Sequence, residues 1–249
     1  MTTCTLLRIH LAVSGRWAIG GVADAWAEVD QPVLVDPRVV GLDGHPPYLP
    51  MTSMAGALRR HFAEDANRWL GPPPPDREDT EQAPEIGGSR LRLLGATGLD
   101  GAAAVRTRGR TSVDGRRGAA LGKSHRTEQW VEPADASIAA WHDGDLDDAL
   151  VESLARWTPF VGRGRTTGHG RAAVSAVDAM TVDLGDEDQL TWWLTERDVW
   201  LRGEAERPGW ARGRTAIGDA GANETSGSEQ LVFQWKVTDP IHVGEGRAD

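Results

Sequence analysis

Two amphipathic helical segments most constrain how this chain can fold. The first begins after Pro50, where apolar side chains recur three or four residues apart, and the second covers residues 146–157 with the same spacing. The apolar positions are Met54, Leu58, Phe62 and Trp69 in the first segment and Leu146, Leu150, Leu154 and Trp157 in the second. Because each helix has one apolar face, each must pack on another layer of the structure.

Strand-like sequence precedes and separates these helices. Residues 6–13 alternate between apolar and polar, and residues 29–35 are a short apolar stretch that Pro32 restricts to an edge or irregular strand. Further strand candidates lie at 91–94, 130–141 and 172–184, and a short helix is expected at 189–194. This order predicts an α+β fold of ferredoxin-like or RNA-recognition-motif-like type, an antiparallel sheet with helices on one face and long loop insertions.

The end of the chain repeats a pattern found near its beginning. Residues 237–249 match residues 13–24 as a strand, a hydrophobic-x-hydrophobic-Gly turn and Ala-Asp, with a one-residue gap. Residues 202–230 between them are rich in Gly, Ala and Ser. We therefore expect one domain over residues 1–201, a flexible linker over 202–230, and the first strand of a second, truncated repeat over 231–249.

The net charge of −10 taken alone argues against a nucleic-acid-binding protein. The charges are segregated, however. Residues 106–126 contain seven Arg and Lys against one acid, Asp114, and residues 163–171 contain three Arg and no acid. The acids gather at 74–85, within a proline-led loop at 71–90, and at 143–152 and 183–188. This distribution predicts a local cationic track suited to phosphate, although two solvated charged loops would give the same composition.

Cysteine and hydropathy patterns indicate the compartment. Cys4 is the only cysteine, which excludes an internal disulfide framework and fits a reducing cytosol. No apolar run approaches the ~20 residues needed to span a bilayer. No two histidines have metal-ligand spacing. We expect a cytoplasmic protein with no membrane partner and no zinc site.

A glycine-rich segment with interleaved arginines follows the second helix. Its four glycines let the backbone approach a ligand closely, and its N–H groups and guanidinium groups suit phosphate oxygens. The segment lacks the Gly-Lys-Ser/Thr ending of a nucleotide-binding P-loop. The alternative is a plain glycine-rich turn. The expected RNA contacts are Gly162, Arg163, Gly164, Arg165, Thr166, Gly168, His169 and Arg171.

Three further features fit RNA binding. Thr52 and Ser53 stand at a helix start, where hydroxyls and free N–H groups cap the helix or bind an anion. The glycine-punctuated basic segment predicts a flexible finger lying across RNA, with Arg110, Arg116, Arg117 and Arg126 as contacts. Trp17, beside a glycine loop, is a candidate for base stacking.

Asp30 is a candidate for catalysis. A carboxylate beside a phosphodiester can hold a divalent cation such as Mg²⁺ or help activate an attacking hydroxyl. A lone Asp before a strand is also a common turn residue. His125 and His169 lie within the basic segments and are candidate RNA contacts or general acids, or surface histidines.

Four stretches together resemble the RAMP superfamily of CRISPR-associated proteins, and within it the Cas7-like backbone subunit of type III effector complexes. The resemblance follows the family order over residues 6–184 and recurs at 231–249. The stretches are residues 30–33, 48–59, 125–132 and 162–171.

The resemblance implies a set of partners and roles. Family members stack along a guide RNA, which Thr52, Ser53, Arg59 and the glycine-rich segment would hold. A thumb-like segment at 106–132 would kink the RNA, and Asp30 would cut a complementary target RNA with a divalent metal. Other RAMP subunits or repeats would be partners.

The chain departs from the family pattern at Ala55, where a lysine is usual, and Arg59 or Arg60 is expected to compensate. The tandem pattern resembles the leading repeat of a fused multi-RAMP protein, whose repeats either cut or only bind RNA. Two other functions remain open. One is a RAMP-type endoribonuclease that processes precursor guide RNA with His125 or His169, and the other is a non-catalytic scaffold.

Overall fold

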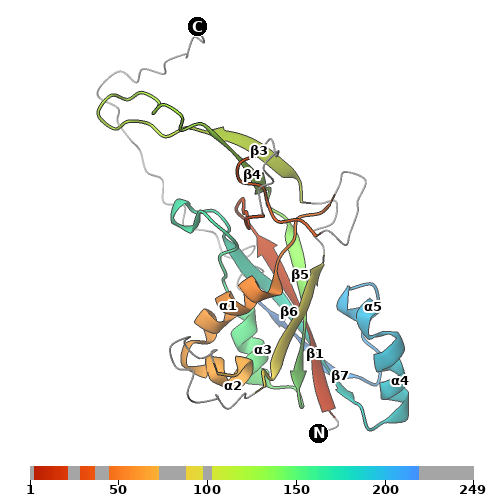
Figure 1. Cartoon of the computed structure of the whole chain (residues 1–249). Coiled ribbons are helices and arrows are strands. Elements are labelled where there is room, and N and C mark those ends of the chain that lie inside the picture. Colours follow the sequence, from red (N-terminus) through yellow and green to blue (C-terminus); the bar gives the residue numbers. More distant parts are fainter. Residues whose placement is uncertain (1–2, 22–28, 37–44, 73–87, 98–102, 219–249) are drawn as a thin grey trace, which may run out of the picture.

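A five-stranded antiparallel sheet forms the centre of the molecule (Figure 1), with strand order β2-β5-β1-β6-β7. The computed structural model describes residues 3–21, 29–36, 45–72, 88–97 and 103–218. The strands are β1 (Thr3–Val13), β2 (Leu91–Thr97), β5 (Asp135–Asp143), β6 (Ala172–Asp183) and β7 (Arg212–Ile217). The central strand β1 pairs with β5 on one side and β6 on the other along most of its length. The first strand predicted from sequence is therefore the middle of the sheet.

One face of the sheet carries the two predicted amphipathic helices. They form α1 (Met51–Phe62) and α3 (Asp148–Ala155), with η1 (Ala63–Asp65) and α2 (Ala66–Leu70) continuing from α1. Helices α1, α2 and α3 lie together on this side of the sheet in Figure 1. Leu58 and Leu154 are fully buried in one apolar core with Leu7 and Ile9 of β1. The apolar face of each helix thus packs on alternate side chains of the sheet.

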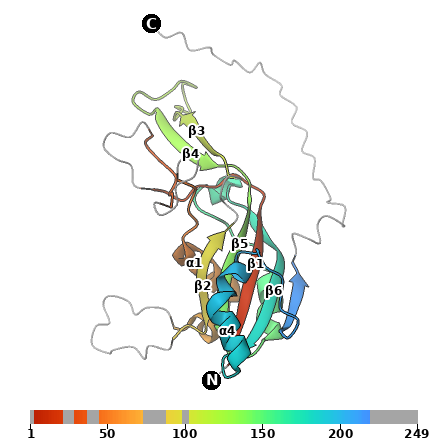
Figure 2. The ribbon, with the colours of Figure 1, turned by 90° about the vertical axis from the view of Figure 1, so that its right-hand side faces the viewer.

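The opposite face of the sheet is covered in part by two further helices, α4 (Glu187–Thr195) and α5 (Arg197–Leu201). Trp193 and Trp200 pack there on Leu6, Met180 and neighbouring side chains in a second core, and Figure 2 shows α4 crossing in front of the sheet. The predicted α+β class with an antiparallel sheet is confirmed. The helices, however, occupy both faces, because Cys4 and Leu6 at the start of β1 are apolar on the face opposite to Leu7 and Ile9 and are buried there in the second core.

Strand β7 lies inside the segment that was predicted to be a linker. It pairs antiparallel with β6 from Thr181↔Arg212 to Ala176↔Ile217. Residues 212–217 therefore belong to the domain, and the linker prediction is wrong for them. The predicted truncated repeat at 231–249 lies outside the described residues.

A two-stranded hairpin projects beyond the end of the sheet (Figures 1 and 2). It consists of β3 (Val105–Arg110) and β4 (Arg126–Val131), paired without interruption from Val105↔Val131 to Arg110↔Arg126. The backbone of Gln31 runs along the free side of β4, where it bonds to Thr127 and Gln129 at 3.0 Å each. The predicted strand at 29–35 therefore forms isolated bridges and joins no strand of the central sheet.

Much of the predicted loop at 71–90 lies outside the described residues. In the part of the chain that is described, no helix is long and apolar enough to cross a membrane.

Candidate nucleic-acid interface

The glycine-rich segment forms a tight, closely packed loop between α3 and β6. Gly164 and Gly168 adopt left-handed backbone conformations on either side of η2 (Arg165–Thr167). A side chain at Gly162 would collide with the carbonyl oxygen of Ala18, and one at Gly170 with that of Val161. Two of the glycines are thus required by close backbone contact, so the loop is held firmly against the segment that follows β1.

The loop and the start of α1 line one shared hollow of about 290 Å³. Ser53 meets Gly162, Arg163 and Arg165 there, which brings two of the sequence-predicted elements together. The guanidinium of Arg165 is exposed and donates from Nε to the Gly162 carbonyl at 3.2 Å. The lining residues are Ala18, Ile19, Gly20, Ser53, Met54, Phe160, Val161, Gly162, Arg163 and Arg165. None of them is acidic, so the hollow is suited to an anion.

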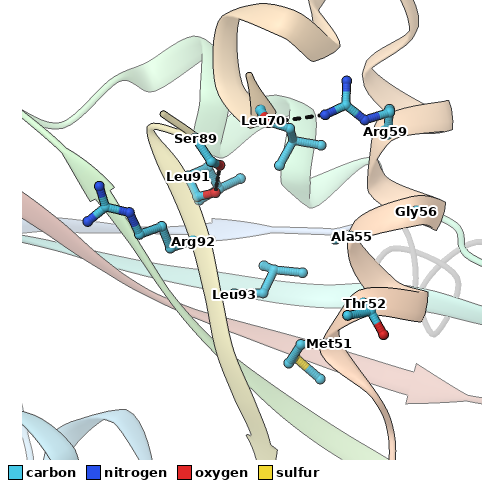
Figure 3. A pocket seen from close by; sticks show the side chains of 10 residues that line it. All are labelled: Met51, Thr52, Ala55, Gly56, Arg59, Leu70, Ser89, Leu91, Arg92 and Leu93. Atoms are coloured by element: carbon cyan, nitrogen blue, oxygen red, sulfur yellow. Dashed lines mark hydrogen bonds between the residues drawn. The ribbon is translucent and has the colours of Figure 1, made fainter. Parts of the chain in front are cut away.

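Thr52 and Arg59 lie instead at a second hollow of about 370 Å³ between α1 and β2 (Figure 3). Arg59 donates hydrogen bonds to the carbonyl oxygens of Leu70 and Gly71 at 3.1 and 2.9 Å, and to the side chain of Asn67 at 3.2 Å. Arg59 therefore holds the end of α2, where carbonyl groups lack helical partners. The structure does not bring Arg59 to the glycine-rich loop.

The start of α1 differs from the expected cap. The capping position is Pro50, and no side chain caps the helix. The backbone N–H groups of Ser53 and Met54 donate to the Pro50 carbonyl at 3.0 and 3.2 Å. The prediction that Thr52 or Ser53 caps the helix is therefore wrong. Both hydroxyls lie on exposed residues of the first turn.

One face of the hairpin collects most of its cationic side chains. Arg106, Arg108 and Arg110 of β3 stand opposite Trp130, Glu128 and Arg126 of β4, and residues directly opposite in an antiparallel pair share a face. Glu128 is the only acid on either strand. Its side chain is 2% exposed and lies 2.9 Å from Arg126 and 3.4 Å from Arg110. Sequence analysis missed Glu128, although its place two residues after Arg126 was a visible signal that, in a strand, the two side chains share a face.

Trp130 joins the hairpin to the glycine-rich loop. The ring of His169 lies 4.5 Å from the Trp130 ring, and the guanidinium groups of Arg163 and Arg110 lie 5.1 and 6.0 Å from its centre. Arg163 also donates to the carbonyl oxygens of Gln31 and Gln129 at 3.2 and 3.0 Å. Burial lowers the pKa of Arg163, Glu128 opposes this effect, and Arg110 and Arg126 add to it. Arg163 and His169 thus connect loop and hairpin.

The remaining predicted contacts are exposed. Arg116 and Arg117 lie at the hairpin tip, where Asp114 accepts their backbone N–H groups at 2.8 and 3.3 Å, a turn that leaves both side chains in solvent. Thr166 and Arg171 are exposed on the glycine-rich loop. Trp17 is buried in the core, so the prediction that it stacks on a base is wrong.

Asp30 is exposed and held by one residue of β4. Its Oδ2 accepts hydrogen bonds from the backbone N–H of Thr127 at 2.6 Å and from the Thr127 hydroxyl at 3.1 Å. These bonds, the backbone bond first, lower the pKa of Asp30, and nearby His125 contributes in the same direction. Thr127 and Glu128 are consecutive on a strand, so their side chains point to opposite faces. Asp30 is thus separated from the arginine-rich face.

Within the described residues there is no group of three or more His, Cys, Asp or Glu side chains that could hold a metal ion. Asp30 is therefore a single carboxylate. Mg²⁺ commonly binds to one or two carboxylates together with waters and substrate phosphates. Asp30 fits such a site only if phosphate groups of bound RNA complete it.

Comparison with family models and with curated proteins gives no match. Among solved structures, the chain is similar to one in the cryo-EM structure of the Type III-B Cmr-beta bound to cognate target RNA. The TM-score is 0.50 and the sequence identity 11%, over 71% of this chain. The match covers 60% of the length of that solved chain. At this identity the similarity establishes a shared fold.

Proposed function

We propose that this chain binds guide RNA as a backbone-type subunit of a type III-like CRISPR effector complex in the cytoplasm. The observation that carries the proposal is the junction of three elements: the glycine-rich loop, the start of α1 and the arginine-rich hairpin. The fold it shares with a chain from a Cmr complex bound to target RNA supports the same assignment.

The chemistry of this junction suits a phosphate backbone. Ser53 and Arg165 offer a hydroxyl and a guanidinium at one hollow, and Arg106, Arg108, Arg110 and Arg126 line one face of the hairpin. Phosphate contacts of this kind act locally, so they are compatible with a net charge of −10. They also make RNA affinity fall steeply with salt.

RNA binding is tested by expressing the full chain with its natural guide array and sequencing the RNA that co-purifies. Short RNAs of array sequence support guide binding, whereas random RNA or none would leave only the scaffold function. Arg108→Ala with Arg165→Ala should weaken RNA binding about 100-fold, at about 10-fold per lost phosphate contact. Arg202→Ala is the matched control, because Arg202 pairs with Glu204 beyond α5.

We further propose that Asp30 takes part in metal-dependent cleavage of the bound target RNA. Its carboxylate is ionised at neutral pH and held in one orientation by Thr127. A divalent cation, when bound, would polarise the scissile phosphodiester. Asp30→Asn should retain RNA binding and lose cutting. Cutting that survives Asp30→Asn would exclude this role.

A metal-independent processing activity is the second candidate. The electrostatic interaction of His125 with Asp30 favours it, because a neighbouring carboxylate can support a histidine that acts as a general acid. A chelator separates the two activities. Cutting that persists in EDTA and is lost in His125→Ala would favour processing, and cutting abolished by EDTA would favour the metal-dependent reaction.

A further inference from the structure

The hairpin places two arginines where they should repel each other. Arg110 and Arg126 are directly opposite in the β3–β4 register, and like charges at such positions destabilise an antiparallel pair. Glu128 offsets this repulsion, because its carboxylate forms an ion pair with each of the two arginines. Arg126 Nε donates to Oε1 at 2.9 Å, and Arg110 Nη1 lies 3.4 Å from Oε2.

Glu128 is buried beneath the two guanidinium groups. Its side chain is 2% exposed, whereas those of Arg110 and Arg126 are 38% and 48% exposed. A buried carboxylate is costly unless it is paired, and the two arginines cover it. Arg126 is hydrogen-bonded to Oε1, whereas Oε2 accepts no hydrogen bond within the described residues and pairs with Arg110 through charge alone. Arg163, the third cation near it, is turned inward to the Gln31 and Gln129 carbonyls.

The ion pairs occupy only part of each guanidinium. Arg126 uses Nε and Arg110 uses Nη1, and within the described residues neither makes another hydrogen bond or ion pair. Each guanidinium has five N–H donors in a fixed fork. Two half-exposed forks therefore stand side by side with donors remaining for an anion.

We propose that Glu128 is a positioning residue that holds Arg110 and Arg126 together as a site for one phosphodiester group. The inference rests on the proposed RNA-binding function and identifies a residue that touches no RNA. Paired guanidinium groups bind a phosphate through charge-assisted hydrogen bonds, provided that their geometry is set in advance. Glu128 sets that geometry. Because it neutralises only one of the two arginine charges, the group keeps a net positive charge that attracts the phosphate.

The proposal predicts that removal of the Glu128 charge lowers RNA affinity, which is the opposite of what charge repulsion alone would give. Removal of a negative charge near RNA should strengthen binding if charge alone mattered. If Glu128 positions the arginines, its removal lets Arg110 and Arg126 move apart and weakens binding. The sign of the change in RNA affinity after Glu128→Gln therefore decides between the two.

The experiment measures the affinity of the full chain for a fluorescent single-stranded oligouridylate at several salt concentrations. We expect Glu128→Gln to weaken binding about 10-fold and to reduce the salt slope by about 0.7, the value for one phosphate contact on a single strand. Glu132→Gln is the matched control, because Glu132 is an acid next to β4 in an exposed pair with Arg16, and it should leave affinity and slope unchanged. Equal or tighter binding by folded Glu128→Gln would overturn the proposal.

A second measurement does not depend on RNA binding or on the stability of Glu128→Gln. Arginine Nε–H resonances of the wild-type chain are followed by NMR during titration with inorganic phosphate. Arg110 and Arg126 should shift together with one apparent affinity, and Arg126→Gln should abolish the Arg110 shift. If RNA does not bind but both resonances shift, the proposed function fails and the anion site stands. If neither resonance shifts, the anion site is rejected.

Discussion

Thr127 donates two hydrogen bonds to the same oxygen of Asp30, one from its backbone N–H at 2.6 Å and one from its hydroxyl at 3.1 Å. The two residues are 97 positions apart in the sequence. The backbone N–H of Asp30 donates in turn to the Thr127 hydroxyl at 3.1 Å. This reciprocal contact fixes the orientation of the Asp30 carboxylate on the edge of the hairpin and lowers its pKa.

Replacement of the Thr127 hydroxyl should raise the pKa of Asp30. Thr127→Val keeps the backbone N–H, which is the first cause of the lowering, and removes the hydroxyl bond, which is the second. We expect a partial rise of the pKa towards the value of an unperturbed aspartate, measured by NMR titration of the side-chain carboxyl carbon. Thr127→Ser should preserve the low pKa. An unchanged pKa in Thr127→Val would show that the hydroxyl bond has no influence.

Two glycines with similar backbone conformations should respond differently to alanine. Gly162 and Gly168 have φ of 73° and 79°, so alanine at either is strained by about 1–2 kcal/mol. At Gly168 the added methyl group meets nothing within 4 Å, but at Gly162 it collides with the Ala18 carbonyl. We expect Gly162→Ala to lower the free energy of unfolding further than Gly168→Ala, as measured by urea denaturation. Equal losses would contradict the close contact of loop and backbone.

Trp130 should be essential for the attachment of the hairpin. It is buried between His169, Arg163 and Arg110, and loss of a buried tryptophan side chain costs about 3–5 kcal/mol. Trp130→Ala should also increase hydrogen exchange in β3 and β4 more than in β1. Trp210→Ala is the control, since Trp210 is partly exposed and its loss should cost less. If hydrogen exchange in β3 and β4 is the same in Trp130→Ala as in Trp210→Ala, Trp130 does not attach the hairpin.

Asp178 should make the fold sensitive to acid. Hydrogen bonds from His10, Thr215 and Arg8, that from His10 first, lower its pKa well below its usual range. A carboxyl with a lowered folded-state pKa stabilises the fold above its unfolded pKa of about 3.9, and this stabilisation is lost as pH falls through the folded pKa.

Asp178→Asn tests this dependence directly. Its free energy of unfolding should be lower than that of the wild type by about 1–3 kcal/mol at pH 6. The difference should shrink steadily below about pH 4, because the carboxyl takes up a proton first in the unfolded chain and only at lower pH in the folded chain. Urea denaturation at a series of pH values measures both curves. Parallel curves down to pH 2 would mean that Asp178 is not coupled to folding.

Truncation should show that β7 belongs to the folded domain. A chain that ends at residue 218 retains β7, whereas one that ends at residue 211 loses its whole ladder with β6. The shorter chain should melt lower, by ~2–4 °C for each kcal/mol lost. Equal melting of both would restore the linker assignment for residues 212–217.

The spacing of apolar residues in the sequence was enough to predict the helices and strands that bury one complete face in the core. Leu58 and Leu154 occupy repeating apolar positions on α1 and α3. The alternation of β1 is clear because Leu7, Ile9, Leu11 and Val13 are buried on one face, whereas Arg8 and His10 on the other face are only partly buried. Strand β7 escaped prediction because it lies at the sheet edge. Only Ala216 of its residues is buried, so no alternation of apolar side chains identifies it.

The candidate site was predictable in its elements but not in the direction of individual side chains. The resemblance assigned Ser53 and the glycine-rich loop to one RNA, and the structure places both at one hollow, although their contact with RNA stays a prediction. Arg59 and Arg163 look like exposed cations in the sequence, yet both donate to backbone carbonyls. A guanidinium has the same composition whether its acceptor is a phosphate or a carbonyl oxygen, and only the folded chain distinguishes them. Glu128 was missed because its burial beneath Arg110 and Arg126 arises only from the pairing of β3 with β4.

Because β3 and β4 pair without a bulge, the hairpin can be lengthened or shortened at its tip without a change in the pairing near the sheet. Beyond Val105 and Val131, and among the residues that the structure describes, its strands pair with each other and with the short segment at Gln31. Two residues inserted in each strand near the tip would lengthen the arm by roughly 7 Å and keep every side chain on its present face, because strand residues alternate with a period of two. One residue in each would turn the distal side chains over. A change in arm length that keeps the distal side chains on their present faces therefore adds or removes an even number of residues in each strand.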